Sequence, residues 1–254
     1  MGRSSSTPLN SLPRFFVDPS QITGVYVDIP GEDAHKISNV LRLRVDEEIV
    51  VLDNTGARYH CRLTAVSKNL SSAEILTLID GPSEPKTSIT LVQALAKGDK
   101  VEQVIRQNTE AGASAFWLMN TDRCIVQIEE KKCDQRVARY QKVAREAAEQ
   151  SNRAKVPEVN GILRLKQALA ASEGSLKLFC YESEQTLTLK QSLQNAQPDQ
   201  AITLFIGPEG GFTNEEVELA KKSGAITISL GSRVLRTETA GLVAISQVLY
   251  ALEG

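Results

Sequence analysis

Two loops carry the residues of this 254-residue chain whose types and spacing could do chemistry. The first, residues 207–213, reads GPEGGFT and sets one carboxylate, that of Glu209, among a proline and three glycines. The second, residues 229–241, reads SLGSRVLRTETAG and holds three charged side chains within six positions: Arg233, Arg236 and Glu238. Glycines let a backbone approach a ligand closely, and arginines stabilise negative charge that develops in a reaction. Both loops are therefore candidates for a ligand site.

The first loop differs from the known phosphate-binding loops. A P-loop ends in Gly-Lys-Ser/Thr, whereas this loop ends in Gly-Phe-Thr, and GPEGGF does not supply the GxGxxG of dinucleotide-binding folds. Glu209 would also repel a pyrophosphate at close range. A tight turn with a capping box of Thr213 and Glu216 explains how the next helix starts. It does not explain a carboxylate surrounded by glycines.

Both loops follow apolar runs that are typical of buried strands, and a third such run ends in CYESE, which adds Glu182. In a parallel sheet, ligands bind at the carboxyl ends of the strands. Backbone amides and carbonyls, small residues and carboxylates suit a neutral or cationic ligand with an adenine to bury. They do not suit a triphosphate.

The elements that must position these loops show two different patterns. From residue 15 to about residue 79, short runs rich in Val and Ile predict five or six strands of a small barrel or sandwich. Residues 33–47 lie between them and predict one short helix, with an apolar face of Ile37, Val40 and Leu41. The Gly- and Pro-containing stretch 80–88 predicts a linker.

Beyond the linker, strands alternate with helices. We expect strands at 88–97, 115–121, 176–182, 201–207 and 225–231, and helices at 99–113, 133–153, 214–225 and 238–253, with a loop or short helix at 187–195. Gly112 should end the first of these helices. This alternation predicts a parallel sheet with helices on its faces.

Bulk properties add few constraints. The net charge of −2 does not by itself indicate nucleic-acid binding, although a local basic face is compatible with this charge. The four cysteines are widely spaced and predict free thiols in a reducing cytoplasm rather than a zinc site. The chain contains no apolar run of membrane-spanning length. We expect residues 1–12 to form a disordered tail.

Two C-terminal segments carry a resemblance to a known family. Residues 205–225, FIGPEGGFTNEEVELAKKSGA, and residues 229–249, SLGSRVLRTETAGLVAISQVL, closely resemble the signatures of the ribosomal RNA small subunit methyltransferase E family. That family belongs to the SPOUT class of knotted RNA methyltransferases that use S-adenosylmethionine. Family-like segments precede these two in the same order: PRFFV, HKISNVLRLRVDE, ALAKGDKVEQVIRQNTEAGA and REAAEQSNRAKVP. The resemblance covers the chain from Pro13 onward.

The resemblance implies an α/β protein of two domains. Residues 13–80 would form a PUA-like RNA-binding β-barrel, residues 81–87 a linker, and residues 88–254 a SPOUT domain with a parallel sheet and a trefoil knot. The family methylates N3 of one uridine in 16S rRNA of the small ribosomal subunit and works as a cytoplasmic homodimer. No metal and no membrane are implied. Two alternatives stay open: a SPOUT enzyme with another RNA target, and a non-catalytic RNA-binding factor of ribosome assembly.

The resemblance also implies roles for particular residues. Arg236 would stabilise the anion that forms when uridine N3 loses its proton, or would orient the target. Glu238 is a weaker candidate for the base, because two neighbouring arginines should lower its pKa. Glu209 would face the cationic part of S-adenosylmethionine or brace its own loop. The cofactor would contact Leu178, Glu182, Ile206, Gly207, Pro208, Glu209, Gly210, Gly211, Leu230, Gly231, Leu235, Arg236, Thr237, Glu238, Thr239 and Ala240. The candidates for RNA contact are Arg14, Lys36, Arg42, Arg44, Lys97, Lys100, Arg123, Arg145, Gln150 and Arg153.

Overall fold

The chain folds into two compact units. The structure is a computed structural model, and it describes residues 8–126, 128–197 and 199–254. The first unit comprises the described residues up to Glu84 together with Ala148–Val156. The second comprises Pro85–Ala147 and Pro157–Gly254. The N-terminal unit therefore includes the first part of the predicted linker and a segment far along the chain, residues 148–156.

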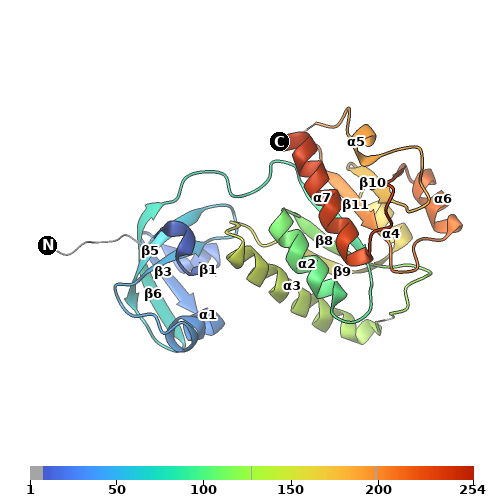
Figure 1. The fold of residues 1–254 in the computed structure, drawn as a ribbon. Helices are drawn as coiled ribbons and strands as arrows, with labels where there is room; N and C mark the ends of the chain where they lie inside the picture. The colour runs from blue at the N-terminus through green and yellow to red at the C-terminus, as the bar shows by residue number, and fades with distance from the viewer. Residues whose placement is uncertain (1–7, 127, 198) are drawn as a thin grey trace. The chain divides into compact units, whose positions relative to one another are not determined.

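The first unit is built on a six-stranded sheet (Figure 1). In spatial order its strands are β1 (Arg14–Phe16), β4 (Glu48–Leu52), β5 (Arg58–Ala65), β6 (Leu70–Leu78), β3 (Tyr26–Pro30) and β2 (Ile22–Thr23). The pair β1–β4 is parallel and the other pairs are antiparallel. Buried and exposed residues alternate along β3, as expected for a strand with one face on a core. Hydrogen bonds between the named strands leave β1 and β2 at the two edges, so closure into a barrel stays a prediction.

Short turns complete this unit. Of the tail expected at residues 1–12, residues 1–7 lie outside the described residues, whereas Leu9–Ser11 form the 3-10 turn η1 and Leu12 is buried. A second 3-10 turn, η2 (Pro19–Gln21), is capped by Asp18. Residues 9–12 therefore have defined structure, and Leu12 belongs to a core.

The single helix predicted at residues 33–47 is wrong. The chain forms α1 (Gly31–His35), then one π-turn, η3 (Lys36–Val40), and is not helical from residue 41 to residue 47. Arg42 has a left-handed backbone (φ 55°), which ends the helical path and brings Leu43 rather than Val40 against the core. Ile37 is fully buried as predicted, whereas Val40 and Leu41 are 65% and 40% exposed.

The second unit contains a six-stranded sheet in which all pairs are parallel, as predicted. In spatial order its strands are β12 (Ile226–Ile228), β10 (Leu176–Cys180), β11 (Ile202–Ile206), β7 (Ile89–Ala94), β8 (Ala115–Asn120) and β9 (Glu158–Arg164). All five residues of β11 are buried, which explains the continuous apolar run in its sequence. This sheet holds three strand ends beside one another at β12, β10 and β11.

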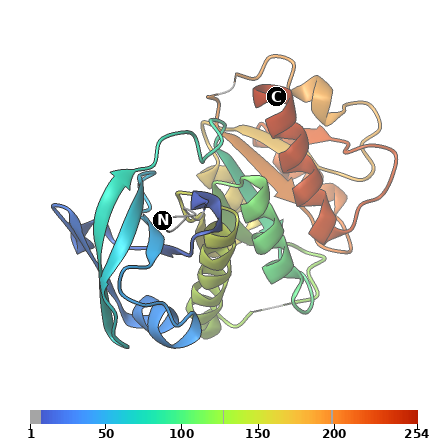
Figure 2. The same cartoon turned by 60° about the vertical axis from the view of Figure 1, so that its left-hand side comes forward.

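Helices connect these strands. They are α2 (Lys100–Ala111), α3 (Cys133–Gln150, after the short η4 at Glu130–Lys132), α4 (Leu165–Ala171), α5 (Leu189–Ser192), α6 (Asn214–Lys222) and α7 (Thr237–Glu253). Gly112 ends α2 in the left-handed conformation, as predicted (φ 107°). Helices α2 and α7 pack side by side on one face of the sheet (Figures 1 and 2). No helix of the described residues is long and apolar enough to cross a membrane.

Strand β9 and helix α4 were not predicted from the sequence. In β9 only Val159 is buried, and Gly161 interrupts the run, so the segment lacks the alternation or continuous apolarity of a typical strand. Helix α4 has seven residues, too few to display a clear helical period.

Candidate functional site

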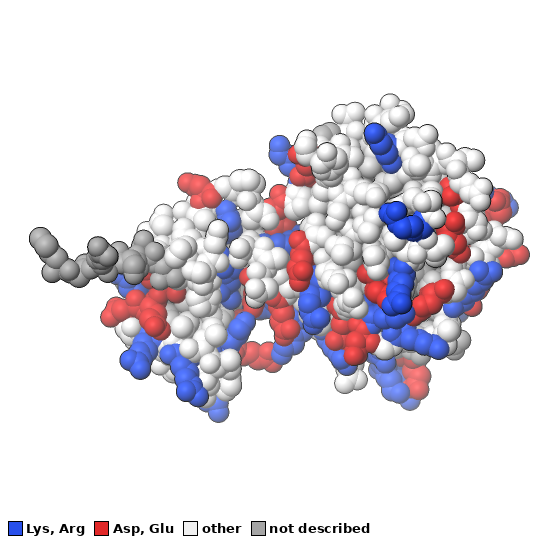
Figure 3. Space-filling view, viewed as in Figure 1, with Lys and Arg blue, Asp and Glu red and all other residues white. Residues whose placement is uncertain are grey.

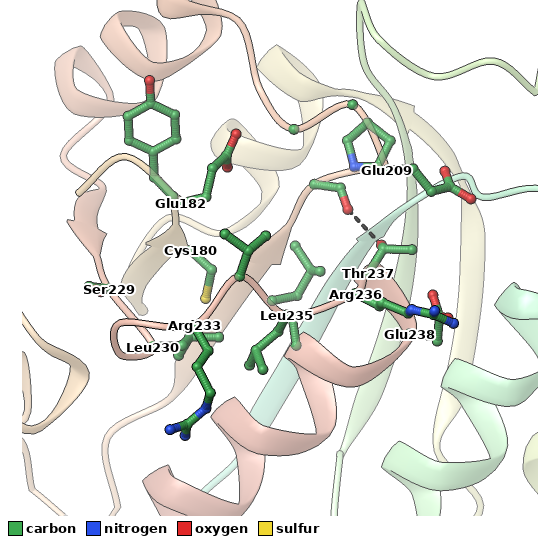
Figure 4. Close-up of a pocket in the computed structure, with 18 of the residues that line it drawn as sticks. Cys180, Glu182, Glu209, Ser229, Leu230, Arg233, Leu235, Arg236, Thr237 and Glu238 are labelled. Atoms are coloured by element: carbon green, nitrogen blue, oxygen red, sulfur yellow. Dashed lines mark hydrogen bonds and ion pairs between the residues drawn. The ribbon is translucent and has the colours of Figure 1, made fainter. Parts of the chain in front are cut away.

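A cavity of about 510 Å³ opens at the carboxyl ends of β10, β11 and β12. Its wall is formed by residues 180–182, 206–211 and 229–238, together with Lys100 and Ala240 (Figure 4). The three strand ends that the sequence pattern singled out therefore enclose one space. Of the predicted cofactor residues, Leu178 and Thr239 do not line it. Leu178 is buried within β10, and Thr239 lies in the first turn of α7.

The glycines of the first loop are required by close neighbours. Gly211 has φ +68°, and a β-carbon there would overlap with Oε1 of Glu182. A β-carbon on Gly207 would lie 3.0 Å from the ring of Phe212. The loop then leads into α6 through the predicted capping box, in which Thr213 and Glu216 exchange hydrogen bonds of 3.2 and 2.9 Å. The loop is thus shaped by its own packing, and its backbone lies open to the cavity.

A hydrogen-bonded chain joins the two loops. The hydroxyl of Thr237 donates to the carbonyl oxygen of Gly207 at 2.7 Å and accepts from Nε2 of Gln93 at 2.9 Å. Gln93 is 1% exposed, and its Oε1 has no hydrogen-bond partner among the described residues. The start of α7 is therefore tied to the end of β11 and to β7.

Glu209 is part of the cavity wall, and its carboxylate is held there by Lys100 and Lys97. Its Oε1 accepts a hydrogen bond of 2.9 Å from Nζ of Lys100 and a longer one, 3.4 Å, from the backbone N–H of Lys97. Burial opposes ionisation of Glu209, but these hydrogen bonds hold its pKa below the usual value. Figure 4 shows its carboxylate pointing away from Cys180 and Glu182. Of the two roles expected for Glu209, the contacts favour bracing of the loop.

The second loop ends in a charged group at the start of α7. Oε2 of Glu238 lies 3.5 Å from Nζ of Lys100, and its Oε1 lies 4.0 Å from Nη1 of Arg236. Oε2 is buried and makes no hydrogen bond among the described residues, so its charge is balanced by this long ion pair with Lys100. The side chain of Arg236 is 86% exposed. Arg236 therefore has a weakly held guanidinium at the rim of the cavity.

The carboxylate of Glu184 binds the strand from which the second loop starts. Glu184 accepts hydrogen bonds from Thr186 and from the hydroxyl of Thr227 at 2.8 Å, and these lower its pKa to about 2. The same turn pairs with the second loop, because Ser229 donates to the carbonyl oxygen of Leu187 at 2.8 Å. Glu184 was not among the residues predicted for the site.

Cys180 lies in the cavity wall and is half-buried (Figure 4). Burial raises the pKa of its thiol to about 12, so the thiol is neutral and a poor nucleophile. Among the described residues, no three His, Cys, Asp or Glu side chains gather as metal ligands would.

The RNA-contact candidates of the first unit have different settings. Arg42 and Arg44 are exposed, whereas Lys36 pairs with Glu149 at 2.7 Å. Arg14 donates to the carbonyl oxygens of residues 9, 10 and 12, and burial lowers its pKa.

Arg153 is 5% exposed and binds Glu84 at 2.5 Å, so it does not present the open guanidinium that a phosphate contact requires. Gln150 is exposed at the end of α3.

In the second unit, Lys97 and Arg123 are exposed and Arg145 is half-buried in α3. Nη1 of Arg123 donates to the carbonyl oxygen of Gly210 at 2.9 Å. Lys100, predicted among the RNA residues, lines the cavity. Figure 3 shows cations and anions interspersed over the surface in that view. On the face shown there, charge alone does not mark an RNA surface.

Comparison with known proteins places the chain in a family. Residues 82–249 match the model of an RNA methyltransferase domain, and residues 29–76 match that of an RNA methyltransferase PUA domain. The chain is 34% identical over 230 residues to ribosomal RNA small subunit methyltransferase E of Bacillus subtilis, which covers 89% of this chain and 90% of the relative. Identity to the enzyme of the same name from Synechocystis is also 34%, over 94% of this chain and 78% of the relative.

A solved structure agrees with these matches. The ribosomal RNA small subunit methyltransferase E of Neisseria gonorrhoeae, bound to S-adenosyl methionine, superposes with a TM-score of 0.86 at 33% identity. The alignment covers 95% of this chain and 98% of that one. The chain therefore belongs to the ribosomal RNA small subunit methyltransferase E family.

Proposed function

We propose that this protein transfers a methyl group from S-adenosylmethionine to N3 of one uridine in 16S rRNA of the small ribosomal subunit. The observation that carries the proposal is the single cavity formed by the two signature loops, 207–211 and 229–238. Its volume of about 510 Å³ lies in the range of small-molecule sites. Carboxylates of Glu182 and Glu238 line it, which suits a ligand that carries positive charge.

The chemistry divides between cofactor and protein. S-adenosylmethionine, when bound, supplies an electrophilic methyl group on a sulfonium. The backbone groups of residues 206–211 and the carboxylate of Glu182 are the groups that would hold it. Arg236, exposed at the rim, would stabilise negative charge on the uridine ring as N3 gives up its proton. Positioning of the reacting atoms should supply much of the rate.

For RNA binding, we propose contacts from the exposed Arg42 and Arg44 in the PUA-matching unit and from Lys97 in the methyltransferase unit. The backbone conformation supports this assignment. The chain turns at Arg42, which has a left-handed backbone, and both Arg42 and Arg44 are exposed. Phosphate contacts of this kind dominate RNA affinity and weaken with salt.

We further propose a homodimer and a knotted C-terminal segment. Helix α7 is apolar on most sides, Tyr250 is 82% exposed, and the surface over this helix bears few charges in Figure 3. These features support burial of α7 against a second copy. The strand order supports the knot, because the chain passes from the edge strand β12 back across the sheet to pack α7 against β11 and β7.

The test is to incubate the protein with methyl-labelled S-adenosylmethionine and unmodified small ribosomal subunits, then to digest the RNA and identify the labelled nucleoside. Label in 3-methyluridine is the expected result. Label in another nucleoside would show that the protein is a methyltransferase but that its target is not uridine N3. Absence of label on subunits and on naked RNA, together with absence of cofactor binding by calorimetry, would favour a non-catalytic RNA-binding factor.

A further inference from the structure

Lys100 occupies a position between the two loops of the cavity. It is the first residue of α2, and its Nζ lies 2.9 Å from Oε1 of Glu209 and 3.5 Å from Oε2 of Glu238. Glu209 belongs to the loop after β11, and Glu238 to the first turn of α7. One ammonium group therefore faces a carboxylate from each of the two segments that form the site.

The surroundings of Lys100 do not resemble those of a phosphate-binding lysine. Two carboxylates within 3.5 Å already neutralise its charge, and its side chain is 33% exposed. The hydrogen bond to Glu209 also raises the pKa of Lys100, so the ammonium stays charged. Release of this lysine to an RNA phosphate would leave Glu209 and Glu238 without their shared cation.

We propose that Lys100 is a positioning residue that holds the loop 207–211 and the start of α7 together and thereby sets the shape of the cofactor cavity. The proposal accounts for an acidic residue in a glycine-rich loop: Glu209 is the attachment point of the loop to Lys100. It rests on the proposed function, because the cavity that Lys100 shapes is assigned to S-adenosylmethionine. Without the ammonium, the two carboxylates repel each other, and the loops that carry them separate.

The test measures cofactor affinity in the absence of RNA. S-adenosylmethionine is titrated into the wild-type protein, Lys100→Met, Lys100→Arg and the control Lys221→Met by calorimetry. Lys221 forms an exposed ion pair with Glu218 on α6 and faces no part of the cavity. Loss of two partly exposed ion pairs should weaken cofactor binding by Lys100→Met about tenfold. Lys100→Arg should recover most of the affinity, and Lys221→Met should match the wild type.

A double-mutant cycle separates positioning from general destabilisation. If Lys100 acts through Glu209, Lys100→Met/Glu209→Gln should bind the cofactor more tightly than the product of the two single effects predicts. Additive effects would overturn the proposal. So would unchanged cofactor affinity in Lys100→Met combined with weaker RNA binding and a smaller salt dependence, which would make Lys100 an RNA contact. Failure of the wild-type protein to bind the cofactor would instead count against the proposed function.

Discussion

The hydroxyl of Thr237 lies 2.7 Å from the carbonyl oxygen of Gly207 and donates a hydrogen bond to it. The first residue of α7 is in this way fixed to the residue that follows β11. The same hydroxyl accepts from Gln93 of β7, so three segments of the chain meet at one oxygen atom beside the cavity. The loops of the site therefore depend on one another for their positions.

Replacing this hydroxyl should loosen the site. Thr237→Val keeps the shape of the side chain but removes the donor to the Gly207 carbonyl and one of the two hydrogen bonds that the buried Nε2 of Gln93 donates, which should lower the free energy of unfolding by about 1–3 kcal/mol. Affinity for S-adenosylmethionine should fall about tenfold, because the two loops are no longer joined. Urea unfolding and calorimetry measure the two quantities. Thr237→Ser retains the hydroxyl and serves as the control, and equal losses in both variants would contradict the role of the hydrogen bond.

Gly211 offers a second test of the loop. Gly211→Ala should be unstable for two reasons, a left-handed backbone at φ +68° and overlap of the new methyl group with Glu182. Gly224→Ala is a matched control, since Gly224 has φ +78° but nothing lies within 4 Å of the added carbon. The control should lose about 1–2 kcal/mol from backbone strain. Gly211→Ala should lose more and should also bind S-adenosylmethionine more weakly.

Equal unfolding free energies for these two alanine variants, measured in urea, would mean that the Glu182 side chain moves aside freely. In that case Glu182 would not be held in the cavity wall, and its assigned contact with the cofactor would lose its support.

The pKa of Glu184 predicts how stability depends on pH. Hydrogen bonds from Thr186 and Thr227 lower this pKa from 4.5 to about 2 in the folded protein. A lowered folded-state pKa stabilises the protein above pH 4.5, and the stabilisation is lost as the pH falls from 4.5 toward 2. Unfolding in urea at pH 6 and at pH 3 should show a smaller difference for Glu184→Gln than for the wild type. An equal difference would show that Glu184 does not contribute. The effect should be modest, because the side chain is only half-buried and solvent screens part of its interactions.

Several local features of the site could be predicted from sequence because they involve neighbouring residues. The capping box of Thr213 and Glu216 and the C-cap at Gly112 each depend on a few adjacent positions. The meeting of the two loops also follows from a general rule, since parallel strands bring their carboxyl ends to one edge of a sheet.

Other features depend on contacts between distant segments. Lys100 and Glu209 are 109 residues apart in the sequence and meet because β7 lies next to β11. The order of strands in a sheet cannot be predicted from a local sequence pattern. Arg153 meets Glu84 across 69 residues, which turned an expected surface charge into a buried ion pair. The prediction of a helix at 33–47 was wrong because the left-handed backbone conformation of Arg42 interrupts a segment whose apolar residues have helical periodicity.

Arg236 provides the test of the proposed chemistry. Its side chain is 86% exposed and its distance to Glu238 is 4.0 Å, so Arg236→Ala should change neither stability nor cofactor affinity appreciably. If the guanidinium stabilises charge on the uridine ring, the methyl-transfer step should slow by about 10²–10³-fold. Single-turnover assays with small subunits isolate this step, and Arg233→Ala, which removes a neighbouring arginine of the same loop, gives the comparison. Transfer at the wild-type rate by Arg236→Ala would remove this residue from the mechanism, whereas a loss confined to cofactor affinity would show that its role is to hold the loop.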